Sequence, residues 1–82
     1  MLMAILSLCR LPLHTRARVT AFCGPPSLGN RLLDLGLTEG TPVHGILNGP
    51  SGDPVAYAFR NTVVALRGSD AACVMVEPVT EP

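Results

Sequence analysis

The side chains that could bind a metal ion or carry out catalysis are few and widely spaced. His14 and His44 are the only histidines, and no HxH, HxxxH or HExxH spacing places two such ligands on one face of a strand or helix. The sequence therefore favours solvated or partly packed histidines over metal ligands. Paired carboxylates, a Ser-His-Asp set and a glycine-rich phosphate loop are also missing from the sequence. We expect no enzyme activity and no bound cofactor, and the ligand spacing does not support a transition metal ion.

Cys9, Cys23 and Cys73 are an odd number of cysteines at wide spacings, without a CxxC pair. A disulfide framework uses an even set, so this pattern indicates a reducing compartment. Because no base lies near them in the sequence, each is expected to be a small buried or half-buried apolar residue. The alternative is a metal ion held by these cysteines and the histidines, within one molecule or between two.

The charge balance argues against polyanionic partners. Six arginines and no lysine oppose six acidic residues, so the formal net charge of the 82 residues is zero. Such a chain has no net field to attract nucleic acid or an anionic membrane surface. The apolar start Met1–Cys9 lacks a basic region and a cleavage site, and it is too short to span a bilayer. We expect a cytoplasmic protein that is not inserted in a membrane.

One short helix is the clearest element of the sequence. Leu28, Leu32 and Leu35 follow i, i+4, i+7 spacing, which predicts one buried helix face. Ser27 is expected to be the N-cap, and Gly36 is expected to end the helix in the left-handed conformation, with the next leucine folding back onto the helix. A helix of roughly two turns is not stable alone, so its leucines must pack against a larger structure.

The rest of the chain predicts strands separated by turns. In the first strand, alternation breaks between Val19 and Phe22, so either Phe22 covers the outside or a bulge brings both inward, and we favour the bulge. Val55, Tyr57 and Phe59 alternate with smaller or polar residues, which predicts an inward-facing aromatic side. The expected strands are 16–23, 41–48, 55–60, 62–67 and 73–77.

Turn chemistry separates these strands. The segment 49–54 holds two glycines and two prolines and predicts a mobile hairpin loop, and Arg60-Asn61 predicts a tight turn. After Gly68, a single helical turn capped by Ser69 is expected. About five strands with one short helix between the first and second predict a mainly β fold, a small SH3-like β-barrel. The chain reads as one domain over 1–82, with a core at about 8–77, an N-terminal extension at 1–7 and a tail at 78–82.

Several short motifs occur together in order along the chain. They are the helix–turn segment Arg31–Thr41, then Val43, Gly52-Asp53-Pro54, Ala65-Leu66-Arg67, Ala71, Val74 and Val76. In this combination the sequence resembles the FeoA family of bacterial ferrous iron transport accessory proteins over nearly its whole length. His14 differs from the glycine that the family usually has before the first strand, and Asn61 replaces a common turn glycine.

This resemblance implies a cytoplasmic regulator or assembly factor that acts on FeoB, the ferrous iron transporter with a G-protein domain. Zero net charge and the absence of a catalytic set agree with a protein interaction module, and self-association is a further outcome. The resemblance extends to SH3-like domains at the C-termini of iron-dependent repressors. The alternative is therefore a metal-responsive regulatory module that binds a transition metal ion directly.

The expected docking surface is the helix and the neighbouring barrel cleft. Helical spacing places Leu33 at the flank of the buried stripe, either exposed or covered by the proline-rich lead-in. Arg31 and Asp34 are expected to form a weak ion pair at i, i+3. Arg60 and Arg67 lie near the helix or on strand edges, and for each charged residue a solvated position or a local ion pair is favoured over a partner contact. The candidate partner-binding residues are Arg31, Leu33, Asp34, Arg60 and Arg67.

Overall fold

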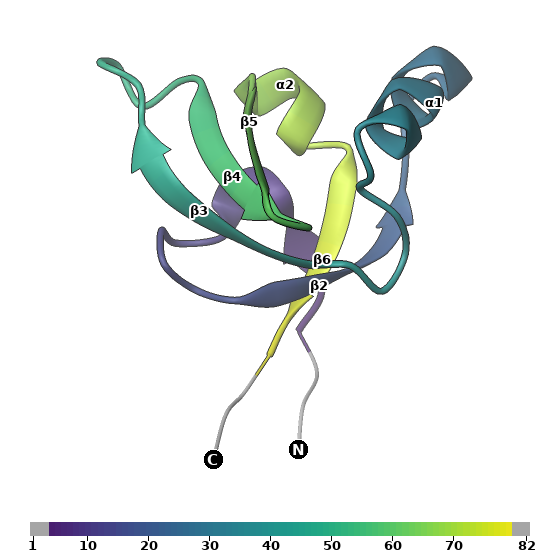
Figure 1. The fold of residues 1–82 in the computed structure, drawn as a ribbon, viewed down its shortest axis with the longest axis horizontal. Coiled ribbons are helices and arrows are strands. Elements are labelled where there is room, and N and C mark those ends of the chain that lie inside the picture. The colour runs from purple at the N-terminus through teal and green to yellow at the C-terminus, as the bar shows by residue number, and fades with distance from the viewer. Residues whose placement is uncertain (1–3, 80–82) are drawn as a thin grey trace.

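Six antiparallel strands form one strongly bent sheet in the order β1-β6-β2-β3-β4-β5, as seen in the computed structural model (Figure 1). The structure describes residues 4–79. The elements are β1 (Leu6–Ser7), the 3₁₀ helix η1 (Leu8–Arg10), β2 (Ala17–Phe22), α1 (Pro26–Asp34), β3 (Pro42–Asn48), β4 (Val55–Phe59), β5 (Thr62–Leu66), α2 (Gly68–Ala71) and β6 (Val74–Pro78). The expected mainly β fold, with a short helix between the first two long strands, is confirmed.

The two ends of the chain meet in this sheet. In β1, Leu6 lies opposite Val76 of β6, so part of the expected extension pairs as a strand. Strand β6 runs to Pro78, and the Val79 amide donates to the Arg16 carbonyl at 2.9 Å, so the start of the expected tail is also fixed. Residues 1–3 and 80–82 of that extension and tail lie outside the described part of the chain.

The bulge expected in the first long strand is confirmed. The pairing of β2 with β6 shifts register between Val19 and Ala21. Val19 is buried, and Phe22 is half-buried and packs against the core. One extra residue on β2 therefore turns both large side chains inward, which strict alternation would not allow.

The start of α1 differs from the prediction. Pro25 is the N-cap and Pro26 is the first helical residue, without any side-chain capping bond. The expected Ser27 cap is wrong because Ser27 already lies inside the helix. Proline suits the first position since the amide it lacks would have no helical partner there.

The end of α1 is the predicted glycine ending. Gly36 has φ +97°, its amide donates to the Leu33 carbonyl at 2.9 Å, and the Leu37 amide donates to the Leu32 carbonyl at 3.0 Å. This pair of bonds is a Schellman motif. Leu37 is consequently buried beside Leu32, whereas Leu35, expected on the buried face, is 39% exposed. The prediction for Leu35 is wrong because that residue is the C-cap, where the helical periodicity ends.

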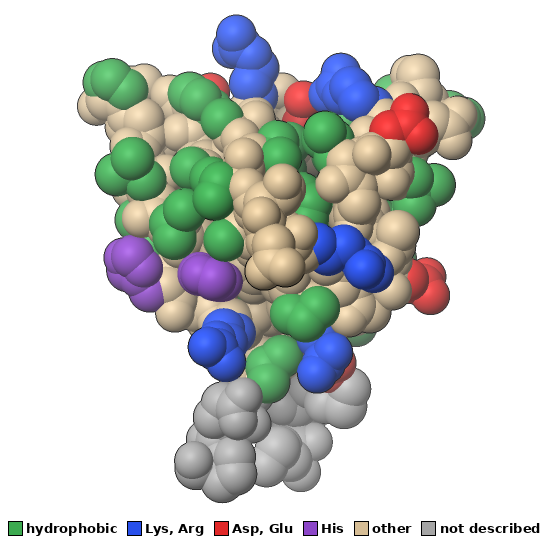
Figure 2. All heavy atoms as spheres, in the orientation of Figure 1, with side chains coloured by type: hydrophobic (Ala, Val, Ile, Leu, Met, Phe, Trp, Pro, Cys, Tyr) green, Lys and Arg blue, Asp and Glu red, His purple; other side chains and the backbone are tan. Residues whose placement is uncertain are grey.

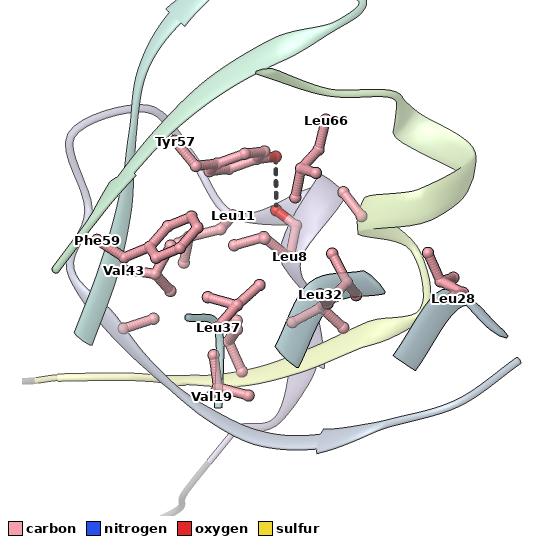
Figure 3. Close-up of a cluster of buried hydrophobic side chains, with 14 residues drawn as sticks. Leu8, Leu11, Val19, Leu28, Leu32, Leu37, Val43, Tyr57, Phe59 and Leu66 are labelled. Carbon is pink, nitrogen blue, oxygen red and sulfur yellow. Dashed lines mark hydrogen bonds between the residues drawn. The ribbon is translucent and has the colours of Figure 1, made fainter. Parts of the chain in front are cut away.

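The core lies inside the bent sheet and beneath α1 (Figure 3). The aromatic residues of β4 point inward as predicted, and the Tyr57 hydroxyl donates to the Leu8 carbonyl at 3.3 Å. Leu8 is fully buried, so the lead-in to β2 also supplies core. The buried apolar residues are Leu8, Leu11, Ala17, Val19, Leu28, Leu32, Leu37, Val43, Tyr57, Phe59, Leu66, Ala71, Val74 and Val76.

Candidate protein interaction surface

A groove of about 400 Å³ opens where the beginnings of β3 and β5 meet the end of β4. The tight turn between β4 and β5 forms one end of it, and Arg60 and Asn61 in that turn both have positive φ. The lining residues are Arg16, Pro42, Val43, His44, Ala58, Phe59, Arg60, Asn61, Thr62 and Val63.

The groove combines apolar walls with basic side chains. Val43 and Phe59 belong to the core, whereas Val63 is 59% exposed. Arg16, His44 and Arg60 lie among the lining residues, and none of the described lining residues is acidic. Figure 2 shows both histidines on one face of the molecule, next to exposed apolar side chains. An apolar side chain with an acidic neighbour is the kind of ligand that this arrangement fits.

Arg60 connects the groove to the end of α1. Its Nε donates to the Gly36 carbonyl at 2.9 Å, and its Nη2 donates to Thr38 Oγ1 at 3.3 Å. The Thr38 and Thr41 hydroxyls are hydrogen-bonded to each other at 2.9 Å, and Thr41 is buried. The Arg60 guanidinium therefore holds the helix-to-strand connection, and Arg60 is also one of the residues that line the groove.

The structure divides the five predicted partner-binding residues into three places. Leu33 is 48% exposed and Asp34 is exposed, both on α1. Arg31, also on α1, reaches α2, whose N-cap is the exposed Arg67. Arg60 lies under the end of α1, as described above. The helix and the groove are thus linked through Arg60, while Arg31 and Arg67 lie toward α2.

The expected local pairing of Arg31 with Asp34 is replaced by a long-range one. Arg31 Nη2 lies 2.7 Å from Asp70 Oδ2 on α2. Figure 1 shows the reason, since α1 and α2 lie on the same side of the sheet. Arg31 therefore pairs with the carboxylate of Asp70 on the neighbouring helix and not with that of Asp34 on its own helix.

Sequence reasoning missed most of the groove. Arg16 and His44 carry no local signal, because the pairing of Ala17 with Val43 brings their segments together. Val63 could have been found, since the alternation that turns Val64 and Leu66 inward must turn it outward. Exposed apolar side chains outside the groove include Leu47 at 66% exposure.

The cysteines are less buried than expected. Cys9 and Cys23 are exposed, which corrects the expectation of buried residues, and Cys73 is half-buried as expected. Burial was inferred from residue type alone, but η1 turns Cys9 outward and Cys23 follows the end of β2. Among residues 4–79, no three histidine, cysteine or acidic side chains gather in a way that could hold a metal ion.

No helix in the described part of the chain is long and apolar enough to cross a membrane.

Comparison with known proteins identifies relatives of this chain. The FeoA domain family model matches residues 6–78. A FeoA from Stenotrophomonas maltophilia, solved in complex with zinc and described as a prokaryotic SH3 domain protein, is 35% identical with a TM-score of 0.76; the match covers 87% of this chain and 88% of that one. No curated protein sequence matches this chain significantly.

Two further structures extend the likeness. The FeoA protein of Chlorobium tepidum is 28% identical with a TM-score of 0.86, and the match covers 92% of this chain and 71% of that one. A manganese-dependent transcriptional repressor is only 11% identical but has a TM-score of 0.85, over 96% of this chain and 44% of the repressor. The repressor therefore shares the fold alone.

Proposed function

Because this chain belongs to the FeoA domain family of non-enzymatic accessory proteins in ferrous iron transport, we propose that it acts in the cytoplasm by binding an FeoB transporter at its G-protein domain. The observation that carries this proposal is the apolar groove with basic side chains, joined to α1 through Arg60. The similar Stenotrophomonas protein is described as a candidate activating factor of ferrous iron transport, which supports a regulatory role rather than a role as the pore.

The proposed contact surface consists of the groove and the exposed side of α1. An apolar partner side chain fills the groove beside Val63, and partner carboxylates meet Arg16 and Arg60. Leu33 extends the apolar contact onto α1, because nearly half of its side chain remains exposed in the free protein. Arg31, Asp34 and Arg67 form the polar rim, where each contact adds little affinity but contributes to specificity.

The direct test is binding of the full chain to the purified cytoplasmic G-protein domain of an FeoB-type transporter. Binding is measured with the G-protein domain free of nucleotide, with GDP and with a non-hydrolysable GTP analogue. We expect binding whose strength differs between the nucleotide states, since a regulator must distinguish the states of its switch. Absence of binding in all three states contradicts the proposal for this domain of the transporter.

The surface itself is tested with matched leucine variants. Leu33 and Leu47 are both exposed leucines, on α1 and at the far end of β3 respectively. Leu33→Glu is expected to weaken binding about tenfold or more, because replacing an apolar contact by a charge at the interface costs roughly 1.4 kcal/mol or more. Leu47→Glu is the control and should bind like the wild type. Circular dichroism confirms that both variants are folded, and unaltered binding by Leu33→Glu removes α1 from the surface.

A second candidate function is direct binding of a transition metal ion. The His14 amide donates to the Gly45 carbonyl at 2.8 Å, so His14 lies beside the strand that carries His44. The similar Stenotrophomonas protein was solved in complex with zinc. Two imidazoles are half of the ligands of a tetrahedral zinc site, so these residues alone do not complete one, and the others must come from water or a second molecule.

This candidate is tested by loading the protein with zinc or ferrous ion, desalting it and measuring the retained metal. Stoichiometric retention that is lost in the His14→Ala/His44→Ala double variant supports it. Absence of retained metal leaves both histidines as surface residues. Sedimentation of the loaded and metal-free protein shows whether a shared ion also drives self-association.

A further inference from the structure

Cys23 and Cys73 are far apart in the sequence but adjacent in the sheet. They directly follow and precede the last pair of β2 with β6, Phe22 opposite Val74. The Cys23 amide donates to the Cys73 carbonyl at 2.8 Å. The Cys73 amide donates to the Asp70 carbonyl at 3.1 Å, so the two cysteines share one of the two bonds of a hydrogen-bonded antiparallel pair. In a complete pair of this kind the Cα atoms are about 5.5 Å apart, within the range that disulfides span, and the single bond keeps the two backbones at a similar approach.

The side chain of Cys73 also points toward the chain that leaves Cys23. Cys73 Sγ lies only 2.8 Å from where a Cβ on Gly24 would stand, so the Cys73 side chain is directed at the chain leaving Cys23. Gly24 has φ +87° and no side chain, which lets the thiol occupy that space. Burial is the main cause that raises the pKa of the Cys73 thiol, and the neighbouring Cys23 and Asp70 side chains add to it, since the protonated Cys73 thiol can donate to Cys23 while negative charge on either neighbour opposes its ionisation. The position of the Cys73 side chain beside Gly24 therefore supports the closeness that the backbone bond gives.

We propose that Cys23 and Cys73 are a modification site, a thiol pair that closes to an intramolecular disulfide when it meets a low-molecular-weight disulfide such as oxidised glutathione. Cys23 is the exposed member and makes the first attack, while the half-buried Cys73 completes the bond. This site lies at the entry to α1, outside the groove, and does not depend on the proposed partner.

The exchange balances without any other reactant. The Cys23 thiolate attacks one sulfur of oxidised glutathione, which forms a mixed disulfide and releases one glutathione thiolate. The Cys73 thiolate then attacks Cys23 Sγ, and the second glutathione thiolate leaves. The two protons from the protein thiols pass to the two departing thiolates, so two protein thiols are oxidised and one disulfide is reduced to two thiols.

A metal ion fits this pair less well than a disulfide. The pair offers two sulfur ligands, and residues 4–79 supply no third histidine, cysteine or acidic side chain to the cluster. The nearest charged group, Asp70, already accepts from Arg31 at 2.7 Å. Structural zinc sites take four ligands, so two thiols alone do not complete one, whereas they are sufficient for a disulfide.

The test uses the full chain with Cys9→Ser, because the exposed Cys9 is the third thiol and could join two molecules. Reduced protein is equilibrated in buffers of increasing oxidised to reduced glutathione, and the remaining thiols are trapped with a maleimide. We expect both thiols to disappear in one step, with an intact mass lower by two hydrogens. That step should not depend on protein concentration, because the bond is intramolecular.

One further variant and a reduction step test the order of the two attacks. In the Cys9→Ser background, Cys73→Ser should accumulate a glutathione adduct on Cys23 that cannot resolve, and reduction of the parent should restore both thiols. Three outcomes would each overturn the proposal. They are glutathione adducts on the parent without closure, disulfide-linked dimers, and two thiols that persist in fully oxidised buffer.

Discussion

At the scale of single residues, Gly36 has the most sharply defined role. It adopts φ +97° at the end of α1, and an added Cβ would lie 3.4 Å from Arg60 Cδ. Gly36→Ala is expected to destabilise the protein by roughly 1 to 2 kcal/mol because a side chain disfavours the left-handed conformation. Urea denaturation measures this change.

Gly29 provides a control of opposite sign. It lies inside α1, and an added Cβ there has no neighbour within 4 Å. Gly29→Ala should therefore stabilise the protein by about 0.5 to 1 kcal/mol, since alanine loses less backbone entropy in a helix. If both variants shift stability in the same direction, the assignment of Gly36 as the helix-ending residue is wrong.

Tyr57 should make stability depend on alkaline pH. Burial, followed by the charges of Cys9 and Asp53, raises the pKa of Tyr57 from 10.0 to about 12. The folded protein holds the phenol proton more tightly than the unfolded chain, so this contribution is complete below pH 10 and is lost as the pH rises to 12. The expected loss of unfolding free energy is about 2 to 3 kcal/mol.

The measurement is simple because Tyr57 is the only tyrosine. Tyrosinate absorbance follows its ionisation directly, while denaturation at each pH gives the stability. Tyr57→Phe should lack the alkaline loss but start up to about 1 kcal/mol less stable, because the hydrogen bond from the phenol to the Leu8 carbonyl is lost and that carbonyl keeps only the Leu11 amide as donor. Ionisation at pH 10 in the folded protein would contradict the prediction.

The inward-facing residues could be predicted from the sequence wherever apolar and other residues alternate strictly along a strand. Tyr57 and Phe59 are buried as predicted, because a half-buried strand has one apolar side. The exposure of Leu35 and Cys23 could not be predicted in this way, because each residue lies where a helix or strand ends. At such positions the side chain's direction depends on how the chain continues, and residue type alone does not specify it.

At the scale of elements, Asp53 ties the loop between β3 and β4 to α2. The Gly68 amide donates a short hydrogen bond to Asp53 Oδ1. Asp53→Ala should destabilise the protein by about 1 kcal/mol, because the amide at the start of α2 loses its acceptor. Asp53→Asn keeps an acceptor oxygen and should lose less. Ser51→Ala, at an exposed position in the same loop, is the control and should change thermal unfolding little.

The elements were predictable to the extent that their signals are local. Gly36 ends α1 as expected because the left-handed turn needs only adjacent residues. The start of α1 was predicted two residues too late, because Pro25 takes the N-cap position and Pro26 the first helical position, both ahead of the serine. Strand β1 was missed because two residues carry no periodicity, and only its pairing with β6 makes it a strand.

At the scale of the whole molecule, β1 should belong to the folding unit. Leu6 packs against the core, and its strand covers the outer edge of β6. Deleting residues 1–7 is expected to leave a folded protein that is roughly 1 to 2 kcal/mol less stable, because apolar burial and ladder bonds are lost. Urea denaturation of the deletion variant, with Leu6→Ala as the packing-only comparison, tests this. An unchanged stability would place the boundary of the domain after β1.

The groove could not be predicted because it exists only in the assembled sheet. Arg16 precedes β2, His44 lies in β3 and Val63 in β5, and strand pairing alone brings them to one face. Arg31 and Asp70 are a similar case, since their ion pair depends on two helices that lie on the same side of the sheet. Sequence patterns specify which side of an element faces inward, but not which distant elements become neighbours.

The place of β6 in the sheet determines when the protein can fold during its synthesis. This strand is made last, yet it lies between β1 and β2, which are made first. While the ribosome still holds residues 74–78, the nascent chain can pair β3 with β4 and β4 with β5, but β1 has no partner and β2 has only β3. The edges of β1 and β2 that pair with β6 therefore stay open until residues 74–78 have left the ribosome, so the two halves of the sheet can be joined only at that stage.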